Sequence, residues 1–126
     1  MIQRESNLIH SELADKIIGC IYDVYNVLGH GFLEKAYENA LVIKLKQIGL
    51  TVVQQAPVKV YFEGQLVGDY VADILIEGNV ILEIKAVSEL TKANEVQLVN
   101  YLKATGIKVG LLVNIGAKLK IVRRVF

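Results

Sequence analysis

The sequence has little of several residue types, and each scarcity excludes a class of protein. It contains one cysteine, Cys20, one proline and no tryptophan. A lone cysteine cannot close an internal disulfide, so a disulfide-stapled secreted fold is excluded and a reducing, cytoplasmic setting is expected. The apolar runs all stop well short of the ~20 residues that a membrane span needs, so no membrane association is expected.

An excess of charge is also missing. The 14 Lys and Arg residues nearly balance the 13 Asp and Glu residues, which leaves a formal net charge of +1. Charge alone therefore does not predict nucleic-acid binding. The sequence does have enough length and apolar content to fold. Its 126 residues are 53% hydrophobic, which predicts a single domain over residues 1–126 with one core.

Helical periodicity opens the chain and returns once later. Apolar residues recur every three or four positions over 11–28, with Ser11 placed to cap that helix, and a second helix is expected over 33–48, before Gly49. A third is expected over 91–105, with Val96, Val99 and Leu102 forming its apolar side.

Strand-like segments fill the rest of the chain. Three are expected as a meander over 52–62, 66–76 and 80–87, and two more over 108–115 and 119–126. The only proline, Pro57, suits an edge strand or a bulge. The order α, α, β, β, β, α, β, β predicts an α/β fold with a mixed sheet.

The chemistry lies in the stretch VADILIEGNVILEIKAV, where charged residues interrupt two apolar strands. Asp73, Glu83 and Lys85 occupy positions where unpaired charge is costly. Glu83 and Lys85 are two residues apart and share one strand face. A two-residue loop would put Asp73 opposite Ile84, whereas a three-residue loop puts it opposite Glu83, and the three-residue loop is the one we predict.

Two interpretations of this cluster stay open from the residues alone. Facing carboxylates repel each other unless a cation lies between them, and hard oxygen ligands suit Mg²⁺ or Mn²⁺. A neighbouring Lys85 would then orient water and stabilise charge on a phosphate. The simpler alternative is a buried salt bridge from Lys85 to Glu83 or Asp73.

These residues resemble a known signature. Asp73 followed by Glu83-Ile84-Lys85 is similar to the motif of the PD-(D/E)xK nuclease superfamily, with Ala72 where the motif's proline would stand. GFLEKAYE, with Gly31, Glu34 and Tyr37, resembles the GxxExxY family within it. The resemblance implies a restriction-endonuclease-like αβββαβ core, here with an extra N-terminal helix and a C-terminal strand.

The resemblance also implies roles for single residues. Asp73, Glu83 and the Ile84 backbone carbonyl would bind Mg²⁺, or Mn²⁺ in its place. Glu34 would complete that metal site directly or through water, although a first-turn acid also suits the helix dipole. Lys85 would position or activate the attacking water.

Other residues, Gly31 among them, are expected to support the site or bind substrate. Tyr37, one turn after Glu34, would orient it or simply pack in the core. Gln97 and Tyr101 are similar to the QxxxY feature of RecB-like nucleases and share one helix face, where they would bind the DNA backbone or a site residue.

The sequence and the resemblance together predict a Mg²⁺-dependent DNA phosphodiesterase, with a homodimer as a further expectation. The alternative is an inactive module that keeps the nuclease fold and binds nucleic acid or a protein. Local basic residues would supply the phosphate contacts in either case. They are Lys92, Lys103, Lys108, Lys118, Lys120, Arg123 and Arg124. Six tyrosines and no tryptophan give no clear stacking platform for bases.

Overall fold

The computed structural model describes residues 9–126, so the first eight residues of the predicted domain lie outside the described part. The elements follow in the predicted order. They are α2 (Ser11–Leu28), α3 (Glu34–Gln47), β1 (Val52–Phe62), β2 (Gln65–Ile76), β3 (Val80–Lys85), α4 (Lys92–Thr105), β4 (Val109–Ile115) and β5 (Leu119–Val125).

The described strands form one mixed sheet in the order β1-β2-β3-β4-β5. The first three are an antiparallel meander, β3 and β4 are parallel across the α4 crossover, and β5 returns antiparallel to β4. This confirms the predicted α/β class and the αβββαβ core, with α2 and β5 as additions. Pro57 lies on the edge strand β1, where the sheet needs no donor from its ring nitrogen.

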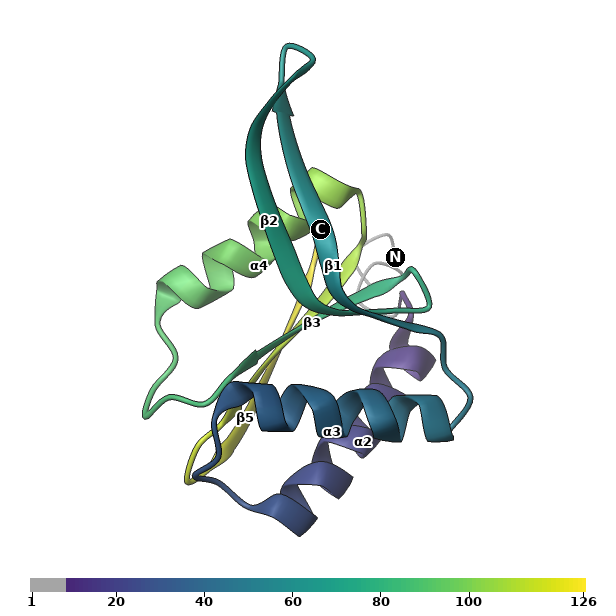
Figure 1. Cartoon of the computed structure of the whole chain (residues 1–126), viewed down its shortest axis with the longest axis vertical. Coiled ribbons are helices and arrows are strands. Elements are labelled where there is room, and N and C mark those ends of the chain that lie inside the picture. The colour runs from purple at the N-terminus through teal and green to yellow at the C-terminus, as the bar shows by residue number, and fades with distance from the viewer. Residues whose placement is uncertain (1–8) are drawn as a thin grey trace.

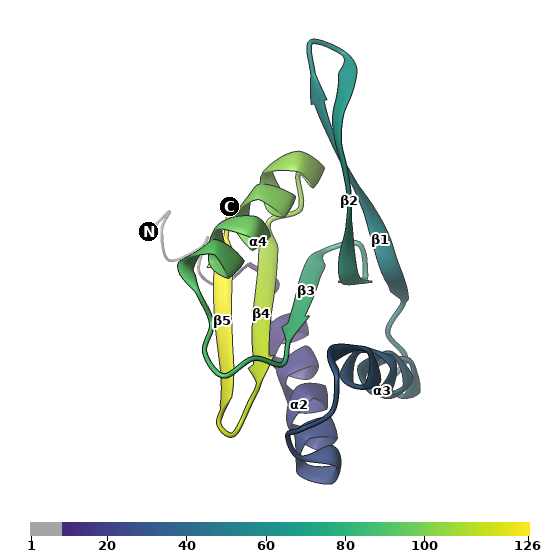
Figure 2. The same ribbon diagram turned by 60° about the vertical axis from the view of Figure 1, so that its left-hand side comes forward.

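Helices cover both faces of the sheet (Figures 1 and 2). Ile17, Ile21 and Leu41 from α2 and α3 pack on one face, and Leu98 and Leu102 from α4 pack on the other. Every residue of β4 is buried, as its nearly continuous apolar run predicts for a strand covered on both sides.

The β1–β2 hairpin extends well beyond the helices (Figure 2). Its outer half carries exposed apolar side chains, among them Tyr61, Phe62 and Leu66. The hairpin therefore forms an arm beside α4 with one end in the sheet and the other in solvent.

Two local predictions are wrong. His10 rather than Ser11 precedes α2, with φ 52° and no capping side chain, because the helix already includes Ser11. On α4 the buried residues are Leu98, Tyr101 and Leu102, while Val96 is 49% exposed. Apolar residues occur on both sides of that helix, so periodicity alone did not identify the core side.

Among residues 9–126, no helix is both long enough and apolar enough to cross a membrane.

Candidate functional site

The β2–β3 hairpin brings the two predicted metal-binding carboxylates together. Residues 77–79 form the loop, and Ile74 pairs with Leu82. One further step along this register places Asp73 opposite Glu83. The three-residue loop predicted from the sequence is therefore confirmed.

The strands exchange side-chain hydrogen bonds at this position. The Asp73 backbone N–H donates to Oε2 of Glu83 at 2.7 Å, and the Ile84 backbone N–H donates to Oδ2 of Asp73 at 2.7 Å. Each carboxylate thus accepts from a backbone amide of the neighbouring strand. The two bonds hold both side chains in fixed positions at the end of the β2–β3 ladder.

The electrostatics of this pair are unfavourable for two ionised carboxylates. Burial, followed by repulsion from Asp73, raises the pKa of Glu83 to about 7. Burial also raises the pKa of Asp73, with further contributions from Glu38 and Glu34. Buried like charges shift in this way because each disfavours the ionised form of the other. A bound cation would relieve this repulsion.

Lys85 lies near both carboxylates without closing an ion pair. Its positive charge lowers the pKa values of Asp73 and Glu83, which opposes the effect of burial. Within residues 9–126, however, the salt bridges do not include Lys85. The buried salt bridge that the sequence left open is therefore not formed in this structure.

The strand alternation aims these groups at the α4 side of the sheet. Leu82 and Ile84 pack with the α2 and α3 residues, and Ile81 packs with the α4 residues. Side chains alternate along a strand, so Glu83 and Lys85 share the face of Ile81. The Ile84 side chain packs in the cluster on the opposite face of the sheet. Only its backbone carbonyl is therefore available for the predicted metal binding.

The chain that follows β3 is held in place by the buried side-chain amide of Asn114. Asn114 of β4 pairs with Lys85 in the parallel register. Its side chain accepts from the Val87 N–H and donates to the Val87 carbonyl, both at 2.9 Å. Asn114 is 4% exposed within an apolar run, and that interruption is the sequence signal that identifies it. It fixes the direction in which the chain leaves β3.

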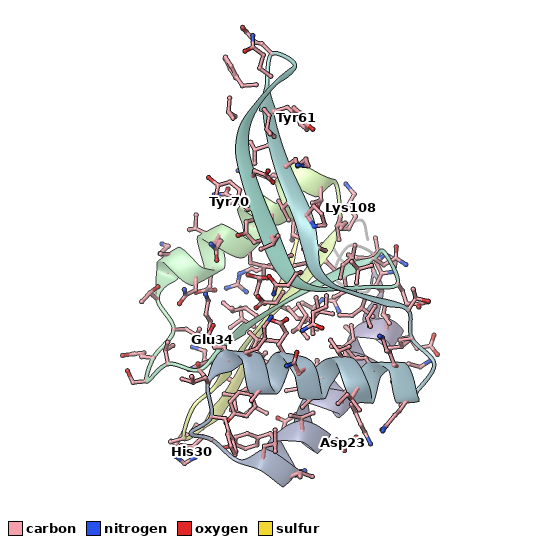
Figure 3. All side chains as sticks on the ribbon, in the orientation of Figure 1. Asp23, His30, Glu34, Tyr61, Tyr70 and Lys108 are labelled. Carbon is pink, nitrogen blue, oxygen red and sulfur yellow. The ribbon has the colours of Figure 1, made fainter. Side chains whose placement is uncertain are left out.

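Glu34 is the first residue of α3 and is exposed (Figure 3). Its charge contributes to the raised pKa of Asp73, which places it in the same electrostatic environment. Residues 9–126 nevertheless contain no group of three or more His, Cys, Asp or Glu residues arranged to hold a metal ion. Asp73 and Glu83 are thus brought together, and Glu34 stands apart from them.

Tyr37 acts on the loop before Glu34. Its hydroxyl donates to the Gly29 carbonyl at 2.7 Å and accepts from the Phe32 N–H at 3.2 Å. The ring itself is fully buried. The hydroxyl therefore contacts the loop backbone instead of the Glu34 carboxylate, so the direct orienting bond considered from the sequence is not present.

Gly31 lies in that loop with φ 115°, a conformation that side chains with a Cβ rarely adopt. The glycine of the GxxExxY pattern thus has a backbone reason for its identity. Together with Tyr37 it defines the path by which the chain enters α3 at Glu34.

Sequence reasoning missed Glu38, a buried acid one turn after Glu34. Its carboxylate accepts from Lys35, Gln54 and Gln55 at 2.5 to 3.1 Å. Burial opposes its ionisation, but the hydrogen bonds from Gln54, Lys35 and Gln55 outweigh that effect and hold the pKa of Glu38 below its ordinary value. Glu38 thereby joins α3 to β1. The i, i+4 spacing from Glu34 was the available signal.

Of the predicted pair on α4, Tyr101 and not Gln97 is in the electrostatic environment of the site. Tyr101 is 7% exposed, whereas Gln97 is exposed one turn earlier. Burial and the charges of Glu83 and Asp73 raise the pKa of the Tyr101 phenol. Tyr101 therefore lies close to the two carboxylates, on the helix that faces them.

The predicted basic residues differ in how available they are. Arg124 is bonded to Glu95, and Arg123 donates to the Ile9 carbonyl. Lys103 is exposed, and its ammonium lies 5.9 Å from the centroid of the Phe126 ring. Some of the C-terminal positive charge therefore serves the fold.

The comparisons with known proteins agree with this arrangement. A family model described as the PD-(D/E)XK nuclease superfamily matches residues 11–125. A search of curated proteins found no match. A solved structure described as "Crystal structure of SSO0001" superposes with a TM-score of 0.57 at 19% sequence identity.

That structural match covers 96% of this chain and 61% of the other chain, so this protein spans under two thirds of its length. At such identity the match supports the fold alone. The narrower GxxExxY family stays a prediction. The family-model match extends over nearly the whole chain and includes Asp73, Glu83 and Lys85, so this chain belongs to the PD-(D/E)XK nuclease superfamily.

Proposed function

We propose that this protein hydrolyses phosphodiester bonds in DNA with the help of Mg²⁺, for which Mn²⁺ can substitute. One observation carries the proposal. Reciprocal hydrogen bonds from the backbone fix Asp73 and Glu83 opposite each other, although burial of both carboxylates and the charge of Asp73 on Glu83 disfavour two charges there. A site that maintains this repulsion gains most from a divalent cation.

The donor chemistry fits Mg²⁺. Asp73, Glu83 and the Ile84 carbonyl would supply oxygen ligands, and Glu34 would act through a water molecule because it stands apart from the pair. The metal would supply Lewis-acid stabilisation of charge on the phosphate oxygens.

Lys85 is proposed to position the attacking water. Its ammonium makes no salt bridge in the described part of the chain, so its hydrogen bonds are available to water or to a phosphate oxygen. The water oxygen bonds to phosphorus while the bond from phosphorus to the leaving oxygen breaks. The water loses a proton to solvent, and the leaving oxygen gains one.

The proposal is tested by cleavage of plasmid and branched DNA with Mg²⁺ or Mn²⁺. Asp73→Asn and Lys85→Ala should each lower the cleavage rate by about 10³-fold or more, as expected when a group acting on the transition state is lost. Asp15→Asn and Lys16→Ala are matched controls at exposed positions and should cleave like the parent protein. Cleavage that survives Lys85→Ala and Asp73→Asn unchanged would assign the activity to another site or to a contaminant.

A second candidate is a nucleic-acid-binding or protein-binding module that keeps the fold without turnover. The lack of a three-residue metal cluster in residues 9–126 favours it. A titration with Mg²⁺ separates the two, because a module without turnover has no need to bind the ion at Asp73 and Glu83. The homodimer and the cytoplasmic location expected from the sequence stay predictions.

A further inference from the structure

A groove runs between the projecting β1–β2 arm and α4. Its volume is about 1010 Å³. Tyr61 and Tyr70 contribute from the arm, and Gln97 and Tyr101 contribute from the helix. Figure 3 shows Tyr61 and Tyr70 on the arm. Residues distant in sequence thus form one surface, which explains why the tyrosine content alone did not define it.

Aromatic rings are the first notable feature of this groove. Tyr61 is 60% exposed and Tyr70 is 50% exposed. The Tyr70 ring centroid lies 6.1 Å from that of Tyr101, with a tilt of 36° between the rings. Half-exposed rings in a concave surface offer flat faces on which another planar group can stack.

The Tyr70 ring has a defined position on the strand. A Cβ added at Gly68 would lie 2.7 Å from Cε2 of Tyr70 and 3.3 Å from Cβ of Val60. The ring therefore covers the space that a side chain at residue 68 would fill. Glycine at this position lets the ring lie against the strand, and Tyr70 still remains half exposed.

The charge of the groove is the second feature. Lys59 and Lys103 line it, and the described residues that line it include no Asp or Glu. Lys59 also contacts Asp69 at 3.4 Å, which reduces but does not cancel its field, because both side chains are exposed. A positively charged groove with aromatic rings suits a polyanion that carries planar bases.

The groove and the candidate catalytic site meet at Tyr101, which packs in the same cluster as Ile81 on the Glu83 face of β3. Tyr101 lines the groove, and its phenol is also close enough to Glu83 and Asp73 to feel their charge. A strand lying along the arm and α4 would therefore lead toward the two carboxylates.

We propose that this groove binds an unpaired segment of DNA by stacking its bases on Tyr61 and Tyr70, so that the protein prefers single-stranded or frayed DNA to blunt duplex. The inference rests on the proposed nuclease function, because it names the form of that function's substrate. Bases in an intact duplex are already stacked and paired, so they cannot use these ring faces. An unpaired strand can, and Lys59 and Lys103 lie beside it to contact its phosphates.

Fluorescence anisotropy in EDTA tests the inference by binding alone. The two probes are a labelled single-stranded oligonucleotide and the blunt duplex of the same sequence. The parent protein should bind the single strand more tightly. Tyr70→Ala and Tyr61→Ala should each weaken single-strand binding by about tenfold, as for the loss of one stacked base, and leave duplex binding nearly unchanged.

Matched variants separate stacking from folding. Tyr22→Ala removes a ring of 49% exposure from α2, on the other side of the sheet, and should bind like the parent. Tyr70→Phe keeps the ring face and should retain binding. The chain has no tryptophan, so tyrosine fluorescence reports directly on its six tyrosines, and the oligonucleotide should quench it less in Tyr70→Ala.

Equal affinity for the single strand and the duplex, or parent-like single-strand binding by both alanine variants, would overturn the inference. Such a result leaves the nuclease proposal standing if Mg²⁺-dependent cleavage still requires Lys85. Conversely, single-strand binding with no cleavage under any metal would contradict the nuclease proposal while supporting the groove.

Discussion

The two faces of the central sheet differ in what they bury. On the α2 and α3 face, Leu82 and Ile84 of β3 join a large apolar cluster. On the α4 face, Glu83 and Lys85 of the same strand share the side of Ile81, which belongs to a smaller apolar cluster. One six-residue strand therefore stabilises the fold on one side and carries the candidate chemistry on the other.

This contrast explains how a small protein tolerates an unfavourable site. Burying Asp73 and Glu83 side by side costs free energy of folding, as their raised pKa values show. The opposite face supplies fully buried residues, among them Ile17, Leu41 and Leu82. Removing a buried apolar side chain from one face should therefore lower the free energy of unfolding, whereas removing a carboxylate charge from the other should raise it.

The largest expected effect on stability is on the apolar face. Ile84→Ala removes a side chain that is 1% exposed and should lower the free energy of unfolding by about 3–5 kcal/mol. Urea unfolding followed by circular dichroism measures it. A loss below about 1 kcal/mol would show that this face contributes far less than its burial implies.

On the other face, the neighbouring substitution should stabilise the metal-free protein. The folded-state pKa of Glu83 is raised to about 7, above its ordinary 4.5, so its stabilising contribution is full below about 4.5 and is lost as the pH rises through 7. Glu83→Gln keeps an oxygen acceptor for the Asp73 amide and removes the charge. The free energy of unfolding of Glu83→Gln should exceed that of the parent by about 2–3 kcal/mol at alkaline pH.

Urea unfolding of the parent and of Glu83→Gln at several pH values measures this difference in stability. The advantage of Glu83→Gln should grow from about pH 4.5 to 7 and then level off. A variant that is less stable than the parent at alkaline pH would mean that neither burial nor the charge of Asp73 disfavours an ionised Glu83 in the folded protein. Added Mg²⁺ should narrow the gap by stabilising only the parent.

A smaller loss of stability is expected from a substitution that loosens the loop before Glu34. Tyr37→Phe removes the hydroxyl that bonds Gly29 and Phe32 and should cost about 1 kcal/mol of stability. It should also lower the cleavage rate, because the position of Glu34 is then less fixed. Tyr25→Phe is the matched control, since its exposed hydroxyl bonds only the Ala117 carbonyl and should cost less. Equal losses in the two variants would remove any special role for the Tyr37 hydroxyl.

The smallest effect concerns the groove. Lys59→Ala and Lys103→Ala should each reduce the slope of log affinity for single-stranded DNA against log salt concentration by about 0.7, the value for one phosphate contact. Binding measured at several salt concentrations gives the slope. Lys16→Ala, on α2, should leave it unchanged, and parent-like slopes in both groove variants would exclude these lysines as phosphate contacts.

The sequence predicted the carboxylate pair because strand registers follow simple arithmetic. Once residues 77–79 are taken as the loop, Asp73 must face Glu83. The same local logic explains Pro57 on the edge strand and the fully buried β4. Such features depend only on neighbouring residues.

Features that depend on distant contacts were not predicted. Glu38 is bonded to Gln54 and Gln55, more than a dozen residues away. Tyr70 and Tyr101 meet only because α4 packs beside the arm. Val96 was assigned to the core because apolar residues on both sides of α4 gave two possible faces. Long-range packing decided each of these cases.

The most direct test of the account is calorimetric titration of Mg²⁺ into the parent protein and into Asp73→Asn, with Asp69→Asn as the control. We expect Mg²⁺ to bind the parent and Asp69→Asn, more strongly as the pH rises through 7 because the carboxylates must lose protons, and not to bind Asp73→Asn. Equal binding by the parent and Asp73→Asn, or none by any of the three, would contradict the claim that Asp73 and Glu83 form a metal site.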